Sequence, residues 1–208
     1  GLDVGILGMQ EGCSGDSARR AGNEYLFQML AETNLATFEE IGVKKIVASC
    51  PHCFHTLGKE YKDYGGQDIE VMHHSQLINH LQQEGKLPAP QHDPSVTFHD
   101  PCYLGRIGGE LEAPRNAIGG VDVEIERHGK QSFCCGAGGA QMFKDAEKGN
   151  KEINIERTEE ALNTKTSIIA AGCPFCNTMI SDGVKAKEKE NDVKVLDIVE
   201  LIVTAQDL

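Results

Sequence analysis

Eight cysteines dominate the chemistry that this chain of 208 residues could perform. Cys134 and Cys135 are adjacent, and the glycine-rich stretch 136–139 follows them at once. Adjacent thiols are awkward as a disulfide, but a backbone that wraps closely around a metal–sulfur centre can use both of them. Glycine permits that close approach and the positive φ angles of a tight loop. The pair therefore predicts a metal–sulfur site.

Three further cysteines stand at distances that could complete this site. Cys102 precedes Cys134 by 32 positions, and Cys173 and Cys176 follow Cys135 as a C-x-x-C pair. Five thiols are one more than a tetrahedral zinc site can use. The excess favours a cluster of several metal ions.

The grouping of the cysteines separates metal binding from a disulfide scaffold. The other three, Cys13, Cys50 and Cys53, supply a second C-x-x-C pair and one single thiol. Disulfide scaffolds spread their cysteines through short, loop-rich chains in an oxidising compartment. Here the cysteines are grouped in a long chain with clear helix and strand patterns. This favours metal or cluster ligands in a reducing compartment, the cytoplasm.

Composition and charge exclude two classes of partner. The chain is 39% hydrophobic and 25% charged, as expected of a globular protein with an ordinary core. Its formal net charge of -12 makes nucleic acid a poor partner, since phosphate contacts need clustered lysine and arginine. No segment approaches the roughly 18 consecutive apolar residues of a membrane-spanning helix. We expect neither nucleic-acid binding nor a membrane span in these residues.

The elements that position the cysteines are repeated along the chain. Residues 43–53 and 166–176 are both short β-branched runs that end in Cys-Pro-x-Cys, and apolar residues at helical spacing follow each run. A second strand and a second helix follow at 69–81 in the first copy and at 193–203 in the second. The chain thus contains two copies of one α/β unit.

The repeat extends upstream of each C-x-x-C pair. Asn34 and Asn154 mark matching helices in the two copies. Segments 1–6 and 120–125 resemble each other, and both have the pattern of a strand. We therefore expect a further strand and a helix before each Cys-Pro-x-Cys.

The same register aligns the upstream cysteines. Cys13 precedes Cys50 by 37 positions, and Cys135 precedes Cys173 by 38. Cys13 is thus the counterpart of Cys135. Gly12 stands where the second copy has another cysteine.

The second copy begins with a segment that the first one lacks. Residues 96–102 predict a strand and then a helix start, with Cys102 in the first turn. Nothing before Gly1 supplies an equivalent. We therefore expect the chain to begin inside its first repeat, and the natural protein to carry a further cysteine upstream of Cys13.

Alternating strands and helices predict an α/β fold of two similar Rossmann-like halves, with parallel strands covered by helices on both faces. Ligands of such sheets bind outside the carboxyl ends of the strands. Cys50, Cys102 and Cys173 all follow predicted strand ends, so we expect the clusters there.

The halves are expected to span residues 1–90 and 91–208. The dividing segment, 86–94, contains three prolines, which punctuate a chain between elements. The first half carries a degenerate cysteine motif, and the second half carries the complete one.

Together these patterns resemble the cysteine-rich CCG motif of the heterodisulfide reductase family. The residues that carry the resemblance are Cys102, Cys134, Cys135, Cys173 and Cys176, with the flanking segments His99–Cys102 and Phe133–Gly139. The family includes heterodisulfide reductase subunits B and D and the iron–sulfur subunits of glycolate oxidase. The resemblance covers nearly the whole chain. It implies the C-terminal part of a longer, membrane-associated iron–sulfur oxidoreductase.

The resemblance also implies ligands and cofactors. The five cysteines of the second half would hold a [4Fe–4S] cluster of the non-cubane type. In the first half, Cys13, Cys50 and Cys53 would hold a second cluster only if an upstream ligand is present. The second-half cluster would be the place of any catalysis. His99, beside the motif, could orient the loop or pass protons.

Such a module would pass electrons between a redox partner and a disulfide or a quinone. The redox partner would be a flavoprotein, an electron-transfer flavoprotein or a ferredoxin-like domain. The resemblance implies that the module lies in the cytoplasm. Another part of the protein would hold it at the inner face of the membrane.

Two other functions remain open. The segment Cys50–Cys53, after a strand and opening a helix, is similar to a thioredoxin-type active site and could serve a metal-free thiol–disulfide oxidoreductase. Alternatively, this pair could join Cys173 and Cys176 in a structural zinc site, although the repeat is expected to hold the two pairs apart. His52, inside the first pair, is expected to have a surface or capping role.

Overall fold

The computed structural model describes residues 2–91, 95–145 and 148–206. The strands are β1 (Lys45–Ala48), β2 (Glu70–His73), β3 (Val96–His99), β4 (Ile168–Ala171) and β5 (Lys194–Asp197). The α-helices are α1 (Asp16–Arg20), α2 (Glu24–Ile41), α3 (Pro51–Gly58), α4 (His74–Gln83), α5 (Glu112–Ala117), α6 (Ile153–Leu162), α7 (Pro174–Ala186) and α8 (Ile198–Gln206). Short 3-10 helices lie at Gly8–Gln10, Glu60–Tyr64, Gly129–Gln131 and Gln141–Phe143, and a π-helix lies at Tyr103–Ile107.

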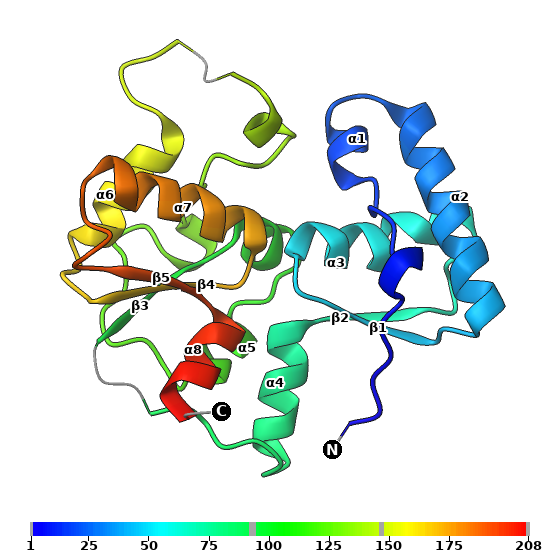
Figure 1. Ribbon diagram of the computed structural model, residues 1–208, viewed down its shortest axis with the longest axis horizontal. Helices are drawn as coiled ribbons and strands as arrows, with labels where there is room; N and C mark the ends of the chain where they lie inside the picture. Colours follow the sequence, from blue (N-terminus) through cyan, green and yellow to red (C-terminus); the bar gives the residue numbers. More distant parts are fainter. Residues whose placement is uncertain (1, 92–94, 146–147, 207–208) are drawn as a thin grey trace.

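The strands form two parallel sheets (Figure 1). β1 pairs with β2, and the second sheet has the order β3-β4-β5. β1 and β4 each lead to a Cys-Pro-x-Cys segment, and β2 and β5 are their matching neighbours. The expected α/β class with parallel strands is confirmed.

Helices cover both faces of the second sheet, as expected. Phe98 and Ile168 belong to an apolar cluster with residues of α5 and α8. On the opposite face, Ile169 packs with Ile180 of α7 and Ala161 of α6. Figure 1 shows α6 and α7 on one side of this sheet and α5 and α8 on the other.

The first sheet is covered less completely. Phe27 and Phe38 of α2 are buried with Tyr61 and pack against Ile46 of β1. Val47, the next residue of β1, points to the opposite face and is 46% exposed. The expectation of helices over both faces therefore holds in full only for the second sheet.

The strands expected at 1–6 and 120–125 do not form among the described residues, and Gly1 lies outside them. Val4 and Ile6 are exposed, and a strand needs a neighbour to pair with. Residues 120–125 do run beside β3, but the Asp122 side chain makes one of the contacts, accepting from the Val96 N–H at 2.7 Å. This carboxylate takes the place of a backbone carbonyl, so the regular hydrogen bonding of a strand does not form.

The expected dividing segment holds no helix or strand over residues 86–91, and residues 92–94, with Pro94, lie outside the described part. The parts before and after it are in direct contact. Gln82 of α4 donates to the carbonyl of Ala117 in α5 at 2.9 Å. Gln206 donates to the Pro88 carbonyl at 2.8 Å.

Candidate metal-cluster site

Cys50 and Cys173 occupy equivalent places in the two halves. Each is the N-cap residue of a helix, α3 or α7, directly after β1 or β4. Pro51 and Pro174 open the two helices, where a missing N–H costs nothing. The positive end of each helix macrodipole favours a thiolate at this place. The expected strand–cysteine–helix order is confirmed twice.

The N-terminal ends of α3 and α7 meet near the centre of the molecule (Figure 1), and this joins the thiols of the two halves. The Cys50 thiol is close enough to the thiols of Cys53 and Cys173 to interact with both. The Cys102 and Cys134 sulfurs lie 4.0 Å apart. Neighbouring thiols are in contact along one row, which runs Cys53, Cys50, Cys173, Cys176, Cys135, Cys134, Cys102.

The expectation that the repeat holds the two C-x-x-C pairs apart is therefore wrong. Each copy places its pair at the start of a helix, as predicted. The two helices start toward each other, so that Cys50 and Cys173 touch. Sequence spacing sets the position of each pair within its own copy and carries no information on how the copies face each other.

Within the second half, interactions among the thiols favour negative charge on Cys134 and Cys173, whose pKa values are lowered, first by their thiol neighbours Cys102 and Cys176. Hydrogen bonds from Cys102 and then Cys135 lower the pKa of Cys134 to about 2. The contact with Cys134 in turn raises the pKa of Cys102 above its usual range, and that of Cys135 to about 12. The row, whose thiols are buried or half-buried, thus holds few thiolates by itself. Metal cations bind thiolates and would stabilise more of these thiols in their deprotonated form. The set of sulfur donors therefore fits a metal–sulfur cluster.

The first C-x-x-C pair has the opposite electrostatics to a reactive dithiol. The pKa of Cys50 is raised to about 12, first through its hydrogen bond with Cys173. The pKa of Cys53 is also raised, by its hydrogen bond with Cys50 and by burial. A nucleophilic cysteine needs a lowered pKa. The thioredoxin-like interpretation of this pair is not supported.

The glycines after Cys134 and Cys135 permit the tight loop. Gly136 has φ 95°, a conformation that favours glycine, and its N–H points at the Cys134 sulfur at 3.3 Å. A Cβ at this position would lie 3.1 Å from Cβ of Ile153. The loop can therefore approach α6 closely only with glycine here.

The Cys13 loop of the first half is held by Asn34 and Tyr61. The Asn34 Nδ2 group donates to the Cys13 carbonyl and to the Tyr61 hydroxyl, both at 2.9 Å. Tyr61 donates to the Ser14 carbonyl at 3.0 Å. Ser14 Oγ lies 3.3 Å from the Cys53 sulfur. The loop therefore places exposed Cys13 on the Cys53 side of the site.

The same asparagine explains why Gly12 has no side chain. Both donors of the Asn34 amide are engaged, so its Oδ1 atom is fixed toward Gly12. A Cβ on Gly12 would lie 2.8 Å from that oxygen, closer than real Cβ contacts allow. The first half cannot carry the adjacent cysteine pair without moving Asn34.

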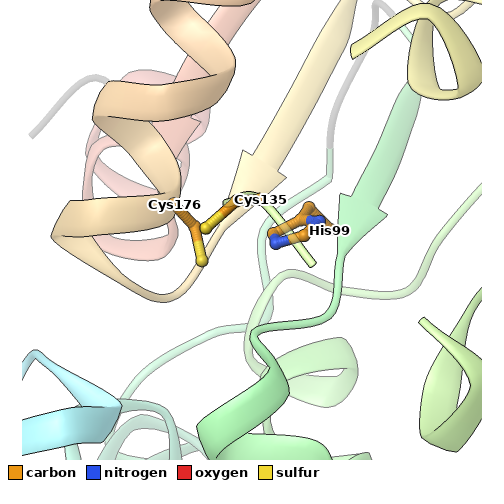
Figure 2. A group of neighbouring side chains, drawn as sticks. All are labelled: His99, Cys135 and Cys176. Carbon is orange, nitrogen blue, oxygen red and sulfur yellow. The ribbon is translucent and has the colours of Figure 1, made fainter. Parts of the chain in front are cut away.

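His99 ends β3 and is fully buried beside the second-half thiols. One of its ring nitrogens and the sulfurs of Cys135 and Cys176 lie within 4.8 Å of one another (Figure 2). Burial lowers the pKa of His99 to about 3. His99 Nδ1 accepts from Arg157 Nε at 2.9 Å.

Sequence reasoning missed Arg157. It lies on the face of α6 that also buries Asn154 and Ala161, and it is 0% exposed. The sequence did offer a signal: Arg157 stands at helical spacing from residues on the buried face of the helix. Lysine and arginine are almost never fully buried without a partner.

His52 does not have the expected surface role. It is 5% exposed, and its Nδ1 atom lies 2.9 Å from the Asp16 carboxylate. Its ring stacks on that of Tyr103 with the ring centroids 3.9 Å apart. Because Tyr103 follows Cys102, this stack is another contact between the two halves near the site.

Comparison with known proteins identifies the family of this chain. A family model described as a cysteine-rich domain, CCG, matches residues 1–58 and 96–181. The chain belongs to this cysteine-rich CCG family. The resemblance inferred from the motif is confirmed, and the matched regions contain all eight cysteines.

Several similar proteins are oxidoreductases by name, and one of them is named as iron–sulfur-binding. The "Probable iron-sulfur-binding oxidoreductase FadF" of Bacillus subtilis is 49% identical over 97% of this chain and 29% of its own length. The "EtfAB:quinone oxidoreductase" of Syntrophomonas wolfei is 44% identical over 100% of this chain and 30% of its own length. One subunit of the dihydromethanophenazine:CoB–CoM heterodisulfide reductase of Methanosarcina barkeri is 31% identical over 100% of this chain and 53% of its own length.

The CCG chain spans about a third of the first two relatives and about half of the third. Among its described residues, no helix combines the length and the apolar composition that a membrane crossing requires.

Proposed function

We propose that this chain is an iron–sulfur electron-transfer module of a larger oxidoreductase. The observation that carries the proposal is the row of contacting thiols at the strand ends, which both halves supply. Soft thiolate ligands suit iron–sulfur clusters, and the row has more thiols than a single-ion site can use. The names of the relatives support the same class of protein.

The second half is the stronger cluster site. Its proposed ligands are Cys102, Cys134, Cys135, Cys173 and Cys176, and five thiols suit a [4Fe–4S] cluster of the non-cubane type. Such a cluster supplies one-electron steps when bound. The chain's own part is to present thiolates and N–H groups, such as that of Gly136 toward Cys134, at a site whose cysteines are buried or half-buried.

The first half has the ligands of an incomplete site. Cys13, Cys50 and Cys53 would hold a second cluster together with a further ligand from outside this chain. The closed position at Gly12 supports four ligands here, which suits an ordinary cubane cluster. We propose plain electron transfer for this half.

We propose an electron-transfer flavoprotein or a ferredoxin-like domain as the electron donor and a quinone or a disulfide as the acceptor. The quinone branch is supported by the name of the Syntrophomonas wolfei relative. The disulfide branch is supported by the name of the Methanosarcina barkeri heterodisulfide reductase. Either function would operate in the cytoplasm, and the quinone branch would operate at the inner face of the membrane.

Anaerobic reconstitution tests the proposal. The purified chain should bind iron and sulfide, and Cys135→Ser should lose most of the iron of the second half. Cys13→Ser should leave the second-half signal in place, because Cys13 lies on the other side of the site. Iron and sulfide far below one cluster per chain, after reconstitution without air, would contradict the proposal.

The contact of Cys50 with Cys173 favours a structural zinc site as a second candidate. It brings the two C-x-x-C pairs to one point, and four thiolates suit tetrahedral zinc. In this case Cys102 and Cys134 would remain outside the site. Metal analysis of protein prepared without air decides between the two: zinc without iron supports this candidate, and iron with sulfide rejects it.

A further inference from the structure

The hydrogen bonds of His99 determine which of its ring nitrogens carries the proton. Arg157 Nε lies 2.9 Å from His99 Nδ1. A guanidinium is always protonated in proteins and has only donors, so Nδ1 must be the acceptor. The neutral ring therefore carries its hydrogen on Nε2.

Arg157 is held too firmly to be an incidental neighbour. Its guanidinium is buried and donates to Glu160 Oε2 and to the Arg127 carbonyl, both at 2.9 Å. It also donates to Ser132 Oγ at 3.3 Å. These contacts fix the plane of the guanidinium and, with it, the direction of the bond to His99.

The remaining nitrogen, His99 Nε2, is buried without a hydrogen-bond partner among the described residues. The ring stands beside the sulfurs of Cys135 and Cys176 (Figure 2). With Nδ1 engaged by Arg157, Nε2 is the nitrogen available on the side of these thiols. Leaving a buried N–H without an acceptor destabilises the folded protein, which indicates that an acceptor binds there.

A histidine that binds a metal through Nε2 has its proton on the opposite ring nitrogen from the one that carries it in His99. It presents a bare nitrogen to the metal, and its other N–H is donated to a carboxylate, a carbonyl or water. Here a cationic donor occupies the second nitrogen instead. The protonated Nε2 suits a hydrogen bond to sulfur and excludes a bond to iron.

We propose that His99 donates its Nε2–H to a sulfur of the second-half cluster, and that Arg157 is the positioning residue that selects this tautomer. Hydrogen bonds to cluster sulfurs help to set reduction potential; since reduction adds negative charge, this one raises it. The inference rests on the proposed iron–sulfur function and concerns the environment of the cluster, with no ligand role for His99.

Potentiometric titration monitored by electron paramagnetic resonance tests the inference on the reconstituted protein. His99→Ala should retain the iron and sulfide of the wild type, and its reduction potential should become more negative. His99→Gln, whose amide N–H can take the place of Nε2–H, should recover part of the change. His80→Ala, at an exposed position of α4, is the control and should leave the potential unchanged.

Nitrogen-15 measurements on histidine supply a readout without activity. In the metal-free protein, the NMR shifts of His99 should show a bare Nδ1 and a protonated Nε2. In the loaded protein, the coupling of His99 nitrogen to the cluster should be weak. A protonated Nδ1, a coupling of the size of an iron–nitrogen bond, or loss of iron in His99→Ala would overturn the inference.

The outcomes separate the two claims. Wild-type protein that binds no iron rejects the proposed function and this inference with it. Wild-type protein that binds the cluster, with the same reduction potential in His99→Ala, rejects the inference alone.

Discussion

At the scale of single residues, the difference between the two copies of the motif has a steric cause. The first copy has Gly12 where the second has a cysteine, and the space that a side chain would need is filled by Asn34. Asn34 cannot turn away without losing its bonds to Cys13 and Tyr61. The first copy thus has glycine at this position because Asn34, which holds the Cys13 loop, leaves no room for a cysteine side chain.

Substitution at Gly12 should destabilise the protein. Gly12→Ala and Gly12→Cys should each lower the free energy of unfolding by about 1–3 kcal/mol, as expected when extra atoms enter a packed place. Gly12→Cys should bind no more iron than the wild type. Denaturant unfolding and iron analysis measure the two effects.

Gly5→Ala is the matched control, because a Cβ at Gly5 meets nothing within 4 Å. It should change stability little. A stable Gly12→Cys variant with additional iron would show that the first half accepts a fifth thiol after all.

A second residue-scale prediction concerns the loop that presents Cys102. Asp100 accepts two hydrogen bonds from Arg115, at 2.5 and 2.9 Å, and one from the Gly129 N–H at 2.8 Å. Burial alone would raise the pKa of Asp100, but these bonds hold it below its usual range. Asp100→Asn keeps the shape but replaces the charged acceptor of Arg115 and Gly129 with a neutral amide, while Arg115 keeps its ion pair with Glu124.

We expect Asp100→Asn to lower the free energy of unfolding by about 1.5–3 kcal/mol, because it weakens buried hydrogen bonds in which one partner is charged. Thermal and denaturant unfolding of the metal-free protein measure this. Glu84→Gln, which breaks a surface ion pair with Lys86, is the control and should cost at most about 1 kcal/mol. Equal effects of the two substitutions would contradict the structural role of Asp100.

At the scale of elements, α6 and α7 must approach each other closely to cover one face of the second sheet. Gly183 of α7 lies against Thr158 of α6, and a Cβ at Gly183 would lie 2.8 Å from Thr158 Cβ. The contact sets the position of α7, and the N-terminus of α7 carries Cys173 and Cys176. Helix packing thus fixes the geometry of the site.

Gly183→Ala should therefore destabilise the protein although alanine favours a helix. The helix preference contributes about 1 kcal/mol in favour of alanine, whereas overpacking costs about 1–3 kcal/mol. The steric cost should prevail, because the close atoms include Cβ of Thr158 and not only the end of a flexible chain. Denaturant unfolding measures the difference.

Gly58→Ala in α3 is the matched helical control. A Cβ at Gly58 would make an ordinary contact with Val71 at 3.4 Å, so its stability should be unchanged or slightly higher. If both substitutions stabilise the protein equally, the packing argument for α6 and α7 fails.

At the scale of the whole molecule, the halves meet at the site itself. His73 of β2 donates its Nε2–H to the carbonyl of Gly172 at 3.1 Å, because Ser75 donates to its Nδ1 atom. Gly172 directly precedes Cys173. We propose that residues 1–90 and 91–208 are two units of one repeat that the site holds together.

Cluster binding should therefore stabilise the whole chain and its internal interface. A ligand that binds only the folded state stabilises by about 2.7 kcal/mol at a hundredfold excess over its Kd. A specific protease site inserted between Pro88 and Ala89 allows the chain to be cut there. The cut halves should co-elute on size exclusion, and loading with iron and sulfide should raise their melting temperature.

The matched control is the cut protein with Cys50→Ser and Cys173→Ser, which removes one thiol from each half at their contact. Its melting temperature should rise less on loading. Halves that separate after cleavage even when loaded would contradict a shared site.

The sequence by itself determined the α/β class, the repeated pattern, the family and the places of Cys50, Cys102 and Cys173 after strand ends. These follow from local patterns: β-branched runs, helical spacing and Cys-Pro at helix starts act within a few residues. The wrong strand predictions at 1–6 and 120–125 show the limit of such patterns, since a strand also needs a partner that the local sequence does not reveal.

Only the tertiary structure decided that Cys50 touches Cys173, that Asn34 closes the position at Gly12, and that Arg157 holds Nδ1 of His99. Each of these contacts joins residues distant in sequence. Such contacts depend on how whole helices and strands are oriented. The N-terminal ends of α3 and α7 lie toward each other, and the buried side chains pack between segments that are distant in the sequence. Spacing along the chain records which residues are available, and packing decides which of them meet.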